Sequence, residues 1–307
     1  MSKLASISSN PTIREYAQGA AQDMTSAIAD FLAPTVEVAT STGQYKSYDE
    51  KHRFSIPDTR RALGGEATKI GFNASDLTYN CAHHALDFPV DYLEEQESAE
   101  LENVFTEAAD MAAEVGALSH EKNVIDTALV ALGAASSLSV GSTDDLIDQL
   151  DQNILTVIKT AGYGGLMGVG VLFGANAYRL FKNHASVRNR FVAGGKSKFA
   201  VPNLDDISEM LISKAQARVS LLAYDTEPEG KAADLDFLMG DDVIVFAKKE
   251  SPTRRDPSFM KTFRLRGQWM KPGSYELPDG RGQAAKFDWS ADVKVTNSAA
   301  GIRRSIS

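Results

Sequence analysis

Residues 101–132 read LENVFTEAADMAAEVGALSHEKNVIDTALVAL, the longest helical pattern in the chain. Apolar side chains recur there at spacings of three and four, which is typical of an amphipathic helix: Leu101, Val104, Phe105, Ala108, Met111, Ala112, Val115, Leu118, Ile125, Ala128, Leu129 and Leu132. Glutamates recur every seven residues on the other face, at Glu100, Glu107, Glu114 and Glu121. An unbroken helix of this length would extend about 50 Å at 1.5 Å per residue, far longer than the usual globular helix.

The segment before this helix has few large apolar side chains for its length. Residues 35–90 alternate polar and apolar side chains near both ends, from Val36 to Val38 and from Ile70 to Cys81, which indicates strands. Between them the polar stretch PDTRRALGGEA favours a turn. We therefore expect a long hairpin that finds its contacts on another molecule. Residues 1–34 precede it as an arm whose order depends on a partner, with a short helix between Ile13 and Leu32.

After Gly141 the pattern becomes a mixture of helices and strands. The expected helices are Asp144–Lys159, Ala175–Lys182 and Leu204–Ala215, and the expected strands are Val169–Phe173, Val219–Tyr224, Val243–Ala247, Phe259–Leu265 and Asp288–Val295. A basic tail with Arg303 and Arg304 follows. The uncharged stretch Thr160–Tyr178 contains six glycines, so it favours a buried strand between tight turns over a membrane span.

Composition and charge exclude several classes of protein. Of 307 residues, 43% are hydrophobic and 24% are charged, which excludes a disordered chain, a collagen and a coiled-coil rod. A lone cysteine, Cys81, excludes a disulfide framework. The net charge of −9 argues against general polyanion binding. Residues 1–141 hold 9 bases and 21 acids, whereas residues 142–307 hold 23 and 20, so an acidic helix and a basic C-terminal region could meet between copies of the chain.

The motifs that could carry chemistry are incomplete. In GYGGLMGVGVLFG, residues 162–174, the glycine spacing is wrong for a dinucleotide fingerprint. Gly195-Lys196-Ser197 is like the end of a phosphate loop, but Arg190 stands where that motif needs its first glycine. Cys81 and His83 could share one strand face, yet a zinc site needs more ligands. We therefore predict no enzymatic activity, no cofactor and no metal site.

The order of these parts resembles the major capsid protein of tailed bacteriophages, which has the Hong Kong 97-like fold. TGQYKSYDEKHRF and RRALGGEATKIGFNASDLTYNC are similar to the arms and tip of the family's E-loop, and residues 101–132 to its spine helix. GVLFGANAYRLFKNHASVRNRF is similar to a segment of the family's A-domain. MGDDVIVFAKKESPTRRDPSFMKTFRL is similar to its late paired strands.

The resemblance implies an α+β fold with five regions. These are an N-terminal arm (1–34), an extended E-loop hairpin with flanking P-domain strands (35–90), the P-domain spine helix (91–140), an α/β A-domain (141–240), and late strands that return through the P-domain and end at the A-domain (241–307). It also implies pentamers and hexamers that close an icosahedral head shell around double-stranded DNA.

The partners implied by the resemblance are other copies of the chain, a portal protein, and scaffold or decoration proteins where these are used. DNA would be enclosed without sequence-specific binding, and no membrane is involved. No secretory signal is evident in MSKLASISSNPTI, so we expect the protein to stay in the cytoplasm where it is made. The resemblance implies assembly there and a final location in the virion.

Two sets of residues are candidates for contacts between subunits. We hypothesise that Arg60 and Arg61 at the hairpin tip pair with acids of an adjacent chain, chosen from Glu94, Glu95, Glu97 and Glu100. Some relatives crosslink a loop lysine to an asparagine of a neighbour with the help of a glutamate. Here the candidates are Lys51 or Lys69, Asn297 and Glu276, and we expect no crosslink.

Two alternatives remain open from the sequence. An encapsulin, a bacterial shell that stores an enzyme, shares the fold and would leave no genome inside. A cytosolic nucleotide-binding enzyme would use the glycine run and the Gly195-Lys196-Ser197 motif, and it would form a particle of one to four subunits.

Overall fold

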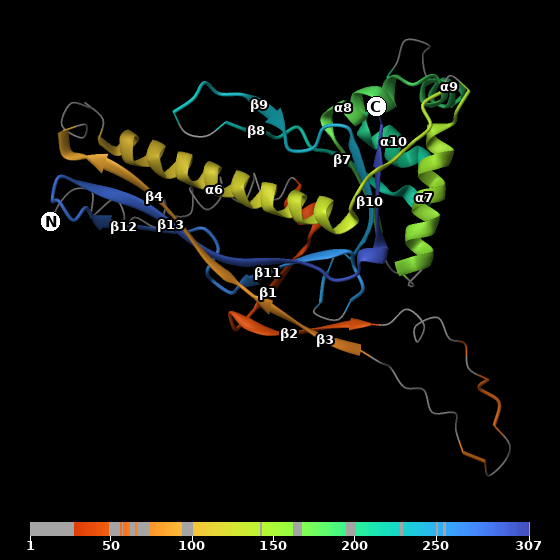
Figure 1. The fold of residues 1–307 in the computed structure, drawn as a ribbon, viewed down its shortest axis with the longest axis horizontal. Helices are drawn as coiled ribbons and strands as arrows, with labels where there is room; N and C mark the ends of the chain where they lie inside the picture. The colour runs from red at the N-terminus through yellow and green to blue at the C-terminus, as the bar shows by residue number, and fades with distance from the viewer. Residues whose placement is uncertain are drawn as a thin grey trace.

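Two five-stranded sheets and one long helix form the frame of the chain in the computed structural model (Figure 1). The described residues are 28–48, 56, 58–61, 65–66, 74–93, 101–141, 143–161, 168–194, 201–227, 230–249, 251–253 and 256–306. No helix in this part of the chain is long and apolar enough to span a membrane.

The long helix α6 runs from Leu101 to Leu132, as predicted. Its 32 residues correspond to about 48 Å. The predicted apolar face is correct at Ala112, Ile125 and Ala128, which are buried. It is wrong at Met111 and Val115, whose side chains are 54% and 55% exposed. The buried face is rotated toward small residues, which let the helix approach the sheet beneath it closely.

Strand β13, Gly282–Val295, forms the spine of the first sheet. Strand β4, Ala82–Asp91, pairs along one edge, whereas β11, Met260–Leu265, and β12, Lys271–Glu276, follow one another along the other edge. Strand β1, Thr35–Val38, adds in parallel to β11. The predicted strand Asp288–Val295 is thus correct but begins six residues too late. Helix α6 covers this sheet through an apolar cluster of Ala112, Ala113, Met270, Phe287, Trp289 and Ala291.

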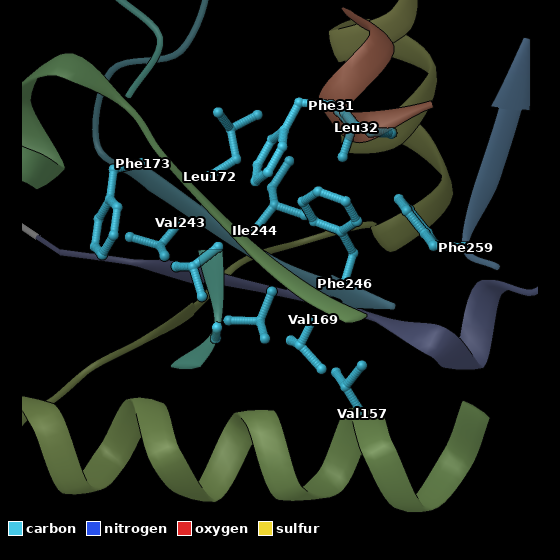
Figure 2. Packing of buried hydrophobic residues seen from close by; sticks show 14 of the residues in the cluster. Phe31, Leu32, Val157, Val169, Leu172, Phe173, Val243, Ile244, Phe246 and Phe259 are labelled. Atoms are coloured by element: carbon cyan, nitrogen blue, oxygen red, sulfur yellow. The ribbon is translucent and has the colours of Figure 1, made fainter. Parts of the chain in front are cut away.

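The second sheet has the order β5-β14-β10-β6-β7. Its strands are Ser136–Ser137, Gly301–Ser305, Asp242–Lys248, Gly168–Phe173 and Gln216–Val219. Helices α7 (Leu146–Ala161), α8 (Ala175–Asn183), α9 (Ala185–Ala193) and α10 (Leu204–Met210) accompany it. Three buried residues of the central strands, Leu172, Ile244 and Phe246, belong to the main hydrophobic core (Figure 2).

Close backbone packing explains the glycine that follows β6, Gly174. A Cβ on Gly174 would collide with the backbone carbonyl oxygen of Gly240. Residues 168–173 form the predicted buried strand, so this part of the glycine run serves close packing. Residues 162–167 and 195–200, which hold the rest of the nucleotide-like motifs, lie outside the described residues.

Two hairpins extend from the frame. Strands β2, Thr42–Tyr48, and β3, Ala74–Asn80, form the predicted long hairpin in continuous antiparallel register. Strands β8, Ala223–Asp225, and β9, Leu235–Phe237, form a smaller one. The predicted single strand Val219–Tyr224 is therefore wrong, because the chain leaves the second sheet after Val219 and pairs anew.

Both ends of the described chain are built into the core. Short helix α3, Ala29–Leu32, places Phe31 edge-on against Phe246, with ring centroids 5.3 Å apart (Figure 2). The described end of the expected arm is therefore held by its own chain. The predicted basic tail is also wrong, because Arg303 and Arg304 lie in β14, which pairs with β10.

Candidate functional site

The long hairpin is fixed at its base by stacked aromatic rings. The Tyr79 ring stacks on Phe263 of β11 with centroids 4.7 Å apart, and the Tyr45 ring lies 5.3 Å from Phe263. A Cβ on Gly43 would collide with the Tyr79 hydroxyl, so this position requires glycine. The Cys81 thiol donates to the Phe263 carbonyl at 3.5 Å, and burial raises its pKa. The hairpin thus leaves the frame in a defined direction.

The paired strands β2 and β3 project from the frame, and the described residues 58–61 beyond them lie far from the rest of the chain (Figure 1). Arg60 and Arg61 belong to these residues and are exposed. The Arg60 backbone N–H donates to the Asp58 carboxylate at 3.0 Å, which forms a local turn. The proposed partners Glu94, Glu95, Glu97 and Glu100 lie outside the described residues, so the pairing stays a prediction.

The crosslink candidates are spread along the first sheet. Glu276 pairs in register with Gln283 near the start of β13, and its carboxylate accepts from the Tyr92 hydroxyl at 3.3 Å. Asn297 follows the other end of β13, about 40 Å away at 3.3 Å per residue. Glu276 and Asn297 therefore do not meet within one chain. Lys51 and Lys69 lie outside the described residues.

Several basic side chains of the C-terminal region have partners within the same chain. Arg303 makes a bidentate pair with Asp242, at 2.9 and 2.8 Å. Arg304 donates twice to the Asn153 side-chain oxygen. The buried Lys261 lies 3.2 Å from the Asp256 carboxylate, whose pKa it helps to lower against the effect of burial. These bases have partners within the chain, and the expected contact between this region and the acidic helix of a neighbour stays a prediction.

The structure does not gather a metal site from Cys81 and His83. Cys81 is buried against Phe263, whereas the His83 ring contacts the Ser290 hydroxyl. Among the described residues, no group of three or more His, Cys, Asp or Glu side chains could hold a metal ion.

One pocket of about 340 Å³ lies where β6, β7 and the end of β10 come together. Its lining includes Lys214, Lys248 and Lys249, and Ser213 beside it has a left-handed backbone with φ of 60°. Lys248 donates to the Gln216 side chain at 2.5 Å. Its described lining residues are basic, small or uncharged, and none of them is a carboxylate or an imidazole.

A buried polar cluster lies where α6, α3 and β11 meet, and the sequence patterns missed it. It comprises Asp30, His120, Glu121, Arg264 and Trp269. The Arg264 guanidinium pairs with Asp30 at 3.2 Å and lies 3.6 Å from the Trp269 ring centroid. The His120 ring packs edge-on against Trp269 at 5.0 Å. The heptad of glutamates had placed Glu121 on the solvent face of the helix, but its side chain is 0% exposed.

Burial has opposite effects on the two neighbouring residues of this cluster. It lowers the pKa of His120 to about 3, with help from the positive charge of Arg264. It raises the pKa of Glu121 to about 7, although the backbone N–H groups of Ala29 and Ile28 act in the other direction. Both groups are therefore held toward their neutral forms.

Comparison with known proteins identifies the fold of the chain. No protein-family model and no curated protein matches the chain. A crystal structure of a phage-related protein from Bordetella bronchiseptica RB50 matches with a TM-score of 0.69 and 14% identity, over 96% of each chain. The capsid of the cyanophage P-SCSP1u matches with a TM-score of 0.57 and 11% identity, over 92% of this chain and 88% of that one. An encapsulin complex from Synechococcus elongatus PCC 7942 matches with a TM-score of 0.54 and 9% identity, over 88% and 83%.

The chain has the Hong Kong 97-like capsid fold. At these identities the likeness establishes the fold alone, and the function is inferred separately below.

Proposed function

We propose that this chain is a shell-forming subunit that assembles with copies of itself. The long hairpin is the observation that carries this proposal. Its base is clamped by Tyr45, Tyr79 and Phe263, while the described residues 58–61 beyond its paired strands lie far from the rest of the chain (Figure 1). A clamped hairpin of this kind suits a contact with a neighbouring subunit, which supplies the packing that a two-stranded ribbon lacks alone.

More specifically, we propose the major capsid protein of a tailed phage, in pentamers and hexamers around double-stranded DNA. Support comes from the phage-related protein that matches 96% of each chain with a TM-score of 0.69. The second candidate is an encapsulin shell, because an encapsulin matches with a TM-score of 0.54, within the range of 0.51 to 0.57 of the phage capsids. The portal protein and any scaffold or decoration protein belong to the capsid proposal alone.

The contents of native particles distinguish the two shells. Particles are purified from the cells or lysates that contain this protein, treated with nuclease, opened and analysed for DNA and for other proteins. The capsid proposal predicts long nuclease-protected double-stranded DNA. Particles that hold an enzyme in many copies and no DNA would contradict it and establish the encapsulin alternative.

A further inference from the structure

The carboxylate of Glu121 is buried without the partners that a charge requires. Its side chain is 0% exposed, and within the described part of the chain neither carboxylate oxygen has a hydrogen-bond donor in good geometry. The backbone N–H groups of Ile28 and Ala29 point toward it, and the Asp30 carboxylate repels it. A buried carboxylate in this position is costly when ionised and far less so when protonated.

The positive charge of Arg264 offsets only part of the cost of ionising Glu121. Arg264 attracts Glu121, but its guanidinium is paired with Asp30 and lies over the Trp269 ring. Glu37 on β1 draws on the same guanidinium. Arg264 is therefore shared among several carboxylates, so it stabilises an ionised Glu121 only in part.

His120, the titratable residue next to Glu121, does not change its charge near neutral pH. His120 lies beside Glu121 on α6, and His84 on β4 faces His120. Because burial, Arg264 and His84 all disfavour its charged form, His120 stays neutral. Its Nε2 atom has no hydrogen-bond partner among the described residues. Glu121 is thus the member of the pair whose charge changes near neutral pH.

We propose that Glu121 is a proton-binding site that controls how firmly residues 28–33 are held against α6. With a proton bound, the neutral carboxyl group fits beside Ile28, Ala29 and Asp30, and the apolar residues of α3 stay packed in the core. Without the proton, repulsion and unmet hydrogen bonding favour release of α3. The site concerns the folded subunit, so it stands or falls separately from the proposed shell function.

Hydrogen–deuterium exchange of the full-length protein tests this proposal. We take the pKa of Glu121 as its ordinary value of 4.5 when α3 is released and as about 7 when α3 is packed. Linkage then predicts that the equilibrium constant for opening at residues 28–33 increases about 30-fold between pH 5.5 and 8. Rates are corrected for the intrinsic effect of pH and compared with those of the buried strand β10. The neutral variant Glu121→Gln should keep residues 28–33 equally protected at both pH values.

A matched control uses the same substitution on the same helix. Glu114 is exposed, so Glu114→Gln should keep the pH dependence of the unmodified protein. If Glu121→Gln does not fold, the unmodified protein alone decides the question, because pH-independent protection of residues 28–33 overturns the proposal. Equal pH dependence in the unmodified protein and a folded Glu121→Gln variant also overturns it.

Discussion

His120 and Glu121 are adjacent on α6, and both are buried at the point where the helix passes from the first sheet to the main core. Their pKa values move in opposite directions, to about 3 and about 7. Between pH 4.5 and 6.5 the folded state therefore binds an extra proton at Glu121 and lacks one at His120, relative to the unfolded chain. The two effects on stability cancel in this window.

Single substitutions should expose each effect. In His120→Gln, Glu121 remains with a raised pKa, so the free energy of unfolding should fall as pH rises from 4.5 to 6.5. In Glu121→Gln, His120 remains with a lowered pKa, so it should rise over the same range. Each slope is at most about 1.4 kcal/mol per pH unit relative to the unmodified protein. Urea unfolding at three pH values measures them, and slopes of the same sign would contradict the assigned pKa shifts.

Arg60 and Arg61 provide a second test at the residue scale. Reversing both to Glu should block assembly and leave the subunit folded, because the proposed contact with acids of a neighbour becomes repulsive. Adding Glu94→Lys, Glu95→Lys, Glu97→Lys and Glu100→Lys should restore it, whereas Arg60→Lys with Arg61→Lys should assemble normally. Sedimentation separates subunits from shells. Normal shells from the first variant, or no rescue by the charge swap, would rule out the pairing.

At the scale of elements, Phe263 connects the long hairpin to the first sheet. Phe263→Ala should destabilise the protein by roughly 3–5 kcal/mol, because a fully buried ring leaves a cavity between Tyr45 and Tyr79. The control Leu77→Ala lies on the same hairpin at a position that is 41% exposed and should cost under about 1 kcal/mol. Denaturant midpoints compare the two, and equal effects would show that the aromatic cluster does not hold the hairpin.

The elements also show what sequence patterns can and cannot predict. Periodicity located α6 and β3, and short apolar runs located β6 and β10. The alternation at Val36 and Val38 belongs to β1 of the first sheet and not to the hairpin. Periodicity placed the wrong side of α6 toward the sheet at Met111 and Val115, since it ranks side chains by polarity and cannot see that small residues let a helix approach closely. The pairing of Arg303 with Asp242 spans 61 residues, and local patterns hold no information about it.

The candidate site was only partly predictable for the same reason. The exposed hairpin arginines follow from a polar stretch without a core, and the structure places Arg60 and Arg61 in the hairpin's outer part. The buried cluster around Glu121 depends on α3, α6 and β11, which are far apart in the sequence. A glutamate in a seven-residue repeat predicts a solvated face, and only tertiary contacts reverse that prediction.

For the whole molecule, an uneven charge distribution and a hairpin without its own core both point to contacts between copies. In the structure, the hairpin supports contacts between copies more strongly than the charge distribution does. Many C-terminal bases are paired within the chain, at Lys261, Arg264, Arg303 and Arg304. The hairpin, whose base is clamped and whose paired strands project from the frame, remains as the main feature that a single chain does not explain.

Electron microscopy of the purified full-length chain tests the central claim most directly. The protein is expressed, purified without denaturant and imaged in negative stain. A shell-forming subunit with this fold predicts closed particles of uniform diameter built from many copies. Discrete oligomers of one to four subunits, with no closed particles under any assembly condition, would contradict the account.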